Sequence, residues 1–125
     1  MISFELFKAE DGIPIYTQII RYMKRGIVAG IINDGDELPS RRVLSATLGV
    51  NPNTVQKAYK MLEDEGLIES KTGAKSCMNL DRDKVEKIRD EWIRNDLKSV
   101  ISAMKKSGVT KENMLEMMGK LWEEE

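Results

Sequence analysis

Two amphipathic helical segments, separated only by the turn "GVN" at residues 49–51, constrain the fold of this chain more than any other feature. In the first segment, "LPSRRVLSATLGV", Ser40 is placed to cap a short helix that stops at Gly49. The apolar spacing predicts that the inner face of this helix consists of Val43, Leu44, Thr47 and Leu48.

The second segment starts at "NPNT" and is expected to be helical from residue 51 to about residue 65. Proline is tolerated at the first helical position, where its missing N–H has no intrahelical partner, and Asn51 before it is a good N-cap. One face is apolar and the other polar. The apolar face consists of Val55, Ala58, Tyr59 and Leu62, and the polar face of Asn53, Gln56, Lys57 and Lys60. A short helix, a tight turn containing glycine and a longer amphipathic helix make the helix-turn-helix pattern.

The segments around this pattern predict a winged helix. A short strand is expected at residues 2–7, and a first helix from Pro14 to about residue 30. After the second helical segment, "GLIES" and "SCMNL" flank "KTGAK", which predicts a hairpin with Gly73 in its turn. The expected fold is mainly α (α+β), with a winged helix-turn-helix domain at residues 1–79.

Residues 80–125 are expected to form a short two-helix dimerisation tail. A long helix ends at Gly108, and Thr110 caps a shorter one, so the pair is expected to be antiparallel. Two helices cannot cover two apolar stripes alone, so a second chain is the natural cover, although packing back onto the first domain is an alternative. The predicted dimerisation residues are Ile88, Trp92, Leu97, Ile101, Met104, Leu115, Met118, Leu121 and Trp122.

The charge distribution favours a nucleic-acid partner. The net charge of the 125 residues is −1, which by itself argues against phosphate binding. From Leu38 to Leu62, however, there are four basic residues and no acidic one. A locally positive face on a nearly neutral protein is typical of a modest electrostatic footprint on DNA.

Composition excludes other classes of function. The single Cys77 forms no internal disulfide, and a chain without histidine lacks the usual zinc ligands, so no metal or cofactor is expected. No clear pairing of nucleophile and base appears, so an enzyme is not expected. The first residues, "MISFELFKAEDG", do not have the pattern of a signal peptide, and no window stays apolar for the roughly 18 residues that a membrane span needs. A reducing cytoplasm is the expected location.

The second helix of a helix-turn-helix lies in the major groove with its first turns against base edges. Asparagine and glutamine pair with adenine, and lysine reaches guanine or phosphate. The helix dipole disfavours arginines in the first turn of the preceding helix. A phosphate or base partner would explain them, and the alternative is that they only solvate an exposed turn. The predicted DNA-binding residues are Arg41, Arg42, Asn51, Asn53, Thr54, Gln56, Lys57 and Lys60, together with Lys71, Gly73 and Lys75 at the wing.

"PIYTQI", "LPSRRVLSATLGVNPNTVQKAYKMLEDEGLIES" and the glycine hairpin closely resemble the DNA-binding domain of bacterial GntR-family transcriptional regulators, over residues 14 to about 73. The short tail resembles the YtrA subfamily. This resemblance implies a homodimer that binds a palindromic operator in double-stranded DNA and represses an operon, often one for an ABC transporter. It implies operator contacts from Arg42, Asn51, Asn53, Thr54 and Gln56, and from the wing around Gly73.

The chain departs from this family at the wing. The family commonly has a second glycine two residues after the first and an aromatic residue two further on, whereas this chain has Lys75 and Cys77. Insertion of the wing tip into the minor groove is therefore left open, and Lys75 is suited to a phosphate contact instead. The alternative function is a winged-helix protein-interaction module that acts without specific DNA binding. The sequence names no operator, regulated gene or effector ligand.

Overall fold

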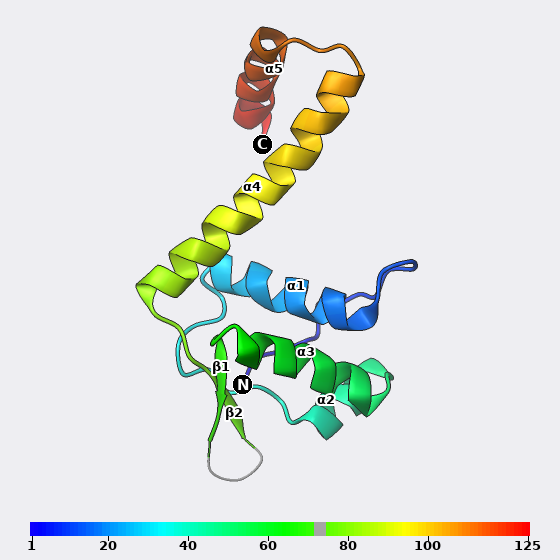
Figure 1. The fold of residues 1–125 in the computed structure, drawn as a ribbon, viewed down its shortest axis with the longest axis vertical. Coiled ribbons are helices and arrows are strands. Elements are labelled where there is room, and N and C mark those ends of the chain that lie inside the picture. Colours follow the sequence, from blue (N-terminus) through cyan, green and yellow to red (C-terminus); the bar gives the residue numbers. More distant parts are fainter. Residues whose placement is uncertain (72–74) are drawn as a thin grey trace. The chain divides into compact units, whose positions relative to one another are not determined.

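The computed structural model describes residues 1–71 and 75–125, which divide into a first unit, residues 1–88, and a second, residues 89–125. The first unit holds α1 (Ile15–Val28), α2 (Arg41–Leu48), α3 (Pro52–Asp64), β1 (Ile68–Ser70), β2 (Ser76–Met78) and the start of α4 (Arg82–Lys106) (Figure 1). The second holds the rest of α4 and α5 (Lys111–Glu124). The functional boundary expected after residue 79 stays a prediction.

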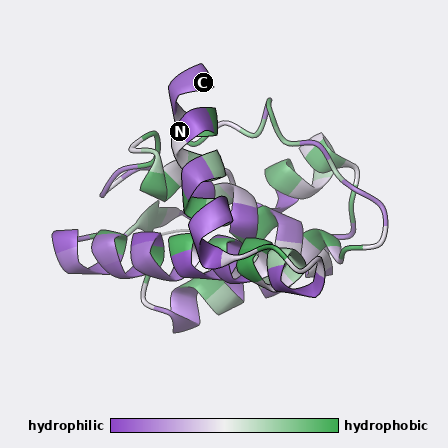
Figure 2. Cartoon of the chain, turned by 90° about the horizontal axis from the view of Figure 1, so that it is seen from above, coloured by the Kyte–Doolittle hydropathy of each residue, from purple (hydrophilic) through white to green (hydrophobic). Residues whose placement is uncertain are grey.

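The helix-turn-helix is formed by α2 and α3, which pack against each other, while α1 packs along α3 (Figure 1). The core of the first unit is apolar, and hydrophobic residues recur among hydrophilic ones along the helices (Figure 2). The largest fully buried side chains come mainly from these helices: Tyr59, Ile19, Met23, Ile27, Leu44, Leu62, Met78 and Val55.

The predicted helix ends are confirmed by their caps. Ser40 accepts a hydrogen bond from the Val43 N–H (3.1 Å) at the start of α2, and Thr110 accepts one from the Asn113 N–H (3.1 Å) at the start of α5. Gly49 ends α2 in the left-handed conformation, at φ 67°, which L side chains rarely adopt. The chain can therefore turn directly from α2 into α3.

The wing is a two-stranded antiparallel hairpin in which Ile68 pairs with Met78 and Ser70 with Ser76. An isolated bridge joins Glu37 to Cys77 on the other edge of β2. The Leu38 N–H also donates to the Ser76 carbonyl (2.9 Å), which ties the segment before α2 to the wing. The hairpin is thus hydrogen-bonded to the segment that leads into the helix-turn-helix.

Two local predictions differ from the structure. Residues 2–7 form no strand. Ile2 and Phe4 are buried, but within the described residues the segment makes one backbone hydrogen bond to another part of the chain, from the Ile2 N–H to the Glu37 carbonyl (2.8 Å). Phe4 also stacks on Tyr22 (4.9 Å between centroids). The inner face predicted for α2 is only partly right. Leu44 is buried and Leu48 packs against the core, as predicted, but Val43 is 51% exposed, Thr47 is exposed, and Ser45 is buried in their place. Ser45 is buried because its hydroxyl donates to the Val50 carbonyl (2.7 Å).

No helix among residues 1–71 and 75–125 is both long enough and apolar enough to span a membrane.

Candidate nucleic-acid interface

The N-terminal end of α3 is fixed by its own first residues. Pro52 occupies the first helical position, and the Asn51 side-chain oxygen accepts a hydrogen bond from the Asn53 N–H (2.8 Å). The cap uses the acceptor of the Asn51 amide and leaves its NH₂ group as a donor. Asn51, predicted to contact DNA, therefore also orients the helix end.

Two side-chain amides stand on the solvent face of α3. Asn53 and Gln56 are exposed, and neither side chain hydrogen-bonds to any residue within the described ranges. Thr54 is half-buried beside them. Each amide offers a donor and an acceptor on one planar group, which is the pattern that pairs with the major-groove edge of adenine.

The two predicted lysines of α3 already have partners. The Lys57 ammonium lies 4.0 Å from the centroid of the Tyr16 ring in α1, a cation–π contact. The Lys60 ammonium lies 2.8 Å from a carboxylate oxygen of Asp64, four residues later, and this hydrogen bond raises the pKa of Lys60. Both groups are exposed, so these contacts are weak and exchange readily for a phosphate.

Arg41 at the start of α2 is partly buried and stacks on α3. Its guanidinium carbon lies 5.3 Å from the centroid of the Tyr59 ring, and its buried Nε has no hydrogen-bond partner among the described residues. The Tyr59 hydroxyl donates to the Pro39 carbonyl (2.8 Å), and burial raises the pKa of Tyr59. The neighbouring Arg42 is exposed and makes no ion pair within the described part of the chain. The start of α2 thus carries one oriented and one exposed guanidinium.

The two described lysines of the wing lie near carboxylates. Lys71 pairs with Glu69 (2.8 Å), which raises the pKa of Lys71, and Lys75 lies 4.0 Å from Glu37. The Lys71 N–H donates to the Lys75 carbonyl (2.8 Å), so the two residues face each other across the hairpin. Gly73, predicted to lie at the wing tip, is outside the described residues.

These partners were missed by reasoning from sequence. The ion pair of Lys60 with Asp64 could have been predicted, because the two residues are four positions apart on one helix. The contacts of Arg41 with Tyr59 and of Lys57 with Tyr16 join residues far apart in the sequence, so no local pattern indicated them. Among the described residues no cluster of three potential metal-ligating side chains occurs.

The second unit presents an apolar surface. Trp122 is 82% exposed, the highest value among the hydrophobic residues of this unit, and Trp92 and Met104 are half-buried. Ile88 differs from the other predicted dimerisation residues because it is only 6% exposed and packs in the core of the first unit. We call the remaining eight residues the tail face: Trp92, Leu97, Ile101, Met104, Leu115, Met118, Leu121 and Trp122.

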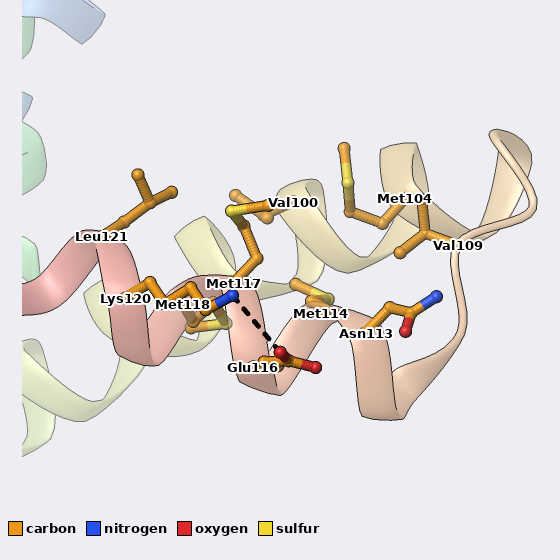
Figure 3. Close-up of a pocket in the computed structure, with 10 residues that line it drawn as sticks. All are labelled: Val100, Met104, Val109, Asn113, Met114, Glu116, Met117, Met118, Lys120 and Leu121. Atoms are coloured by element: carbon orange, nitrogen blue, oxygen red, sulfur yellow. Dashed lines mark ion pairs between the residues drawn. The ribbon is translucent and has the colours of Figure 1, made fainter.

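A groove of about 570 Å³ runs between the end of α4 and α5 (Figure 3). Its walls are mainly apolar and rich in methionine, from Met104 in α4 and from Met114, Met117 and Met118 in α5. An ion pair between Lys120 and Glu116 (3.3 Å) lies at its edge. Methionine side chains are flexible and polarisable, so such a groove adapts well to an apolar partner.

Comparisons with known proteins give one consistent family. The family described as bacterial regulatory proteins, gntR family, matches residues 15–75. The HTH-type transcriptional regulator YhcF of Bacillus subtilis is 35% identical over 103 residues, covering 82% of this chain and 85% of that protein. The HTH-type transcriptional repressor YtrA of Bacillus subtilis is 55% identical over 60 residues, 48% of this chain and 46% of that protein.

A solved structure agrees along most of the chain. A GntR family transcriptional regulator from Listeria monocytogenes superposes with a TM-score of 0.81 at 34% identity, covering 90% of this chain and 98% of that one. The similarity therefore includes the tail as well as the winged helix.

Proposed function

Because the chain belongs to the GntR family of bacterial regulatory proteins, in its YtrA subfamily, we propose that it is a homodimeric repressor that binds a palindromic operator. Its relatives and its fold are those of transcriptional regulators with a DNA-binding helix-turn-helix, not those of enzymes. Repression, the palindrome and the dimer are the parts that we propose.

The observation that carries the proposal is the start of α3. Asn53 and Gln56 present two side-chain amides that have no hydrogen-bond partner among residues 1–71 and 75–125, on a helix whose first turn is fixed by Asn51 and Pro52. Burying an amide without a partner is costly, whereas matching its donor and acceptor to a base edge is specific. We assign base readout to Asn53 and Gln56, with Thr54 beside them.

The cations around α3 are assigned to the phosphate backbone. Arg42 is exposed and Arg41 is oriented by Tyr59, and both lie at the N-terminal end of α2, where the helix dipole also favours an anion. Asn51 supplies its NH₂ group, and Lys57 and Lys60 supply exchangeable ammonium groups. Lys71 and Lys75 reach the backbone from the wing, and Gly73 remains a proposed contact by resemblance alone.

The second copy of the chain is the proposed occupant of the tail face. Six of its eight residues are exposed, and together with the methionine-lined groove they form an exposed apolar surface whose hydration is unfavourable. A twofold dimer buries the same patch of both subunits at once. It also supplies two recognition helices for two operator half-sites, so that the twofold symmetry of the protein matches the twofold symmetry of a palindromic operator.

The regulated genes are proposed by resemblance. The matching YtrA is described as a repressor. The resemblance of the tail to the YtrA subfamily implies that the regulated operon encodes an ABC transporter. Binding to chromosomal DNA places the proposed activity in the cytoplasm.

The proposed function is tested by capture of fragmented genomic DNA with the purified protein, followed by footprinting of the enriched fragments. The expected result is a small set of protected sites with twofold symmetry, one of them beside the protein's own gene. Enrichment without a common site would contradict the proposal and favour the interaction module instead.

A further inference from the structure

The start of α4 is held to the end of the recognition helix by a lysine that contacts backbone carbonyls instead of a carboxylate. Lys84 Nζ donates to the Gly66 carbonyl (2.8 Å) and to the Asn79 carbonyl (3.1 Å). Gly66 directly follows Glu65, the C-cap of α3, and Asn79 directly follows β2. One ammonium group therefore joins the ends of three elements: the recognition helix, the wing and the tail helix.

The backbone leading into α4 is fixed by three further hydrogen bonds. The Asn79 N–H donates to the Leu67 carbonyl (2.8 Å), and the Leu80 N–H donates to the Asp34 carboxylate (2.8 Å). The Lys84 N–H donates to the Asp81 carboxylate (2.8 Å), which caps the new helix. These bonds hold the backbone of residues 79–84 in place within the first unit.

Packing continues this attachment for nearly two turns of α4. Leu80 and Ile88 are buried in the core of the first unit, and Val85 packs against it. Lys84, which lies between Leu80 and Ile88 in the sequence, is half-buried. Removing an ammonium group from water raises the free energy of the folded state unless the group is hydrogen-bonded. Its two carbonyl partners meet that requirement, so its position is well defined.

A second lysine, from α1, reaches the same end of α3. Lys24 of α1 pairs with Glu65 (3.0 Å). Cations near the C-terminal end of a helix are favoured by the helix dipole, so both lysines stabilise this end of α3. They differ in what they connect, because Lys24 attaches α3 to α1 whereas Lys84 attaches it to the tail helix.

We propose that Lys84 is a positioning residue that fixes the direction in which α4 leaves the recognition helix, and that it thereby restricts the spacing of the operator half-sites. The spacing part rests on the proposed dimeric function. Half-sites of helix-turn-helix dimers lie about 34–36 Å apart, or a multiple of this, so a change in the direction of α4 displaces one recognition helix from its groove.

The first test measures the direction of α4 without DNA. Nitroxide labels are attached to Ala46→Cys on α2 and Glu91→Cys on α4, in a Cys77→Ser background. The labelled protein is diluted with unlabelled protein, and pulsed electron paramagnetic resonance then measures the distance between the two labels. We expect one narrow distance distribution for the parent protein and a clearly broader one for Lys84→Met. An unchanged distribution in Lys84→Met would overturn the proposal.

The second test measures spacing on DNA. Operators selected with the parent protein are altered by adding or removing one base pair between the half-sites. The parent is expected to lose at least about tenfold in affinity, and Lys84→Met at most about threefold, with binding to a single half-site unchanged. Equal discrimination by the two proteins would contradict the proposal.

Matched variants separate positioning from stability. Lys87→Met removes an exposed ammonium three residues later on α4 and should match the parent in both tests. Lys24→Met removes the other cation at the end of α3 and is expected to lower the melting temperature without changing spacing discrimination.

If Lys84→Met does not fold, Lys84→Gln is used, and its shorter side chain should give the same broadening. If the parent selects no site at all, the proposed function fails while the label distances still decide the role of Lys84.

Discussion

The guanidinium carbon of Arg41 lies 5.3 Å from the centre of the Tyr59 ring, and the Tyr59 hydroxyl donates to the carbonyl of Pro39, two residues before Arg41. One side chain in the core of α3 thus holds both the cation and the backbone that leads into α2. The orientation of Arg41, a proposed DNA contact, is therefore set by a residue of α3.

Arg41→Lys should weaken operator binding by about 1 kcal/mol although it keeps the charge, because an ammonium group lacks the planar face that stacks on Tyr59 and the donor fork that suits a phosphate. Fluorescence anisotropy with labelled operator measures the change. Arg21→Lys, on the exposed side of α1, is the matched control and should bind like the parent. Equal affinity for Arg41→Lys and the parent would show that the stacking has no role in binding.

Tyr59→Phe should lower the free energy of unfolding by about 1–3 kcal/mol, because the buried Pro39 carbonyl loses its donor. Urea denaturation measures this loss. Affinity of the folded variant for the operator should change little, because the ring beside Arg41 remains.

The stability of the parent should fall at alkaline pH more steeply than that of Tyr59→Phe. Burial raises the pKa of Tyr59 above its ordinary value of 10.0, so the folded state binds the phenolic proton more tightly than the unfolded state. The resulting stabilisation is complete below pH 10.0 and is lost as the pH rises above that value towards the folded-state pKa. Parallel slopes of unfolding free energy against pH for the two proteins would contradict this assignment.

Asn53→Ala and Gln56→Ala should each weaken specific binding by about 1–3 kcal/mol and leave binding to random duplex nearly unchanged, because base contacts carry sequence information and phosphate contacts do not. Competition assays with operator and random DNA measure both affinities. Glu63→Ala, an exposed residue of the same helix, controls for effects on the helix and should keep the ratio of the two affinities.

Asp64→Asn should strengthen DNA binding by about twofold, because it releases the Lys60 ammonium from its ion pair before a phosphate arrives. The removed negative charge also acts at a distance, so the double variant Asp64→Asn with Lys60→Met is needed. In that background the gain from Asp64→Asn should largely disappear. A gain of the same size with and without Lys60 would assign it to overall charge alone.

Trp122→Glu should convert the proposed dimer to a monomer, because it places a charge on the exposed apolar face of α5. Sedimentation equilibrium measures the association. The monomer should keep its winged helix and bind a single half-site, but lose most of its affinity for the full operator. Lys111→Glu, at the exposed start of the same helix, should remain dimeric.

Local patterns were sufficient to predict most of the architecture. The caps at Ser40, Asn51 and Thr110 and the glycine at position 49 lie next to the helices that they bound, so the helix ends could be read from neighbouring residues. The wing strands followed from two short apolar runs around a turn. The alternation in residues 2–7 indicated burial but not pairing, because whether a partner strand lies alongside is not encoded locally.

The chemistry of the interface was only partly predictable. Residue type and helical spacing identified Asn53 and Gln56 as polar side chains facing solvent. The contacts of Arg41 with Tyr59 and of Lys84 with Gly66 depend on how α2 and α4 pack at opposite ends of α3, and no spacing in the sequence encodes that packing.

The central claim is sequence-specific DNA recognition through α3. The most direct test selects binding sites from random duplex DNA. The affinity for the selected site is then divided by the affinity for random duplex, at several salt concentrations. The account predicts a twofold-symmetric site bound at least about a thousandfold more tightly than random duplex, with both affinities falling as salt rises. It predicts that the ratio falls in Asn53→Ala and Gln56→Ala. A parent protein that selects no common site, or a ratio near one that these substitutions leave unchanged, would contradict it.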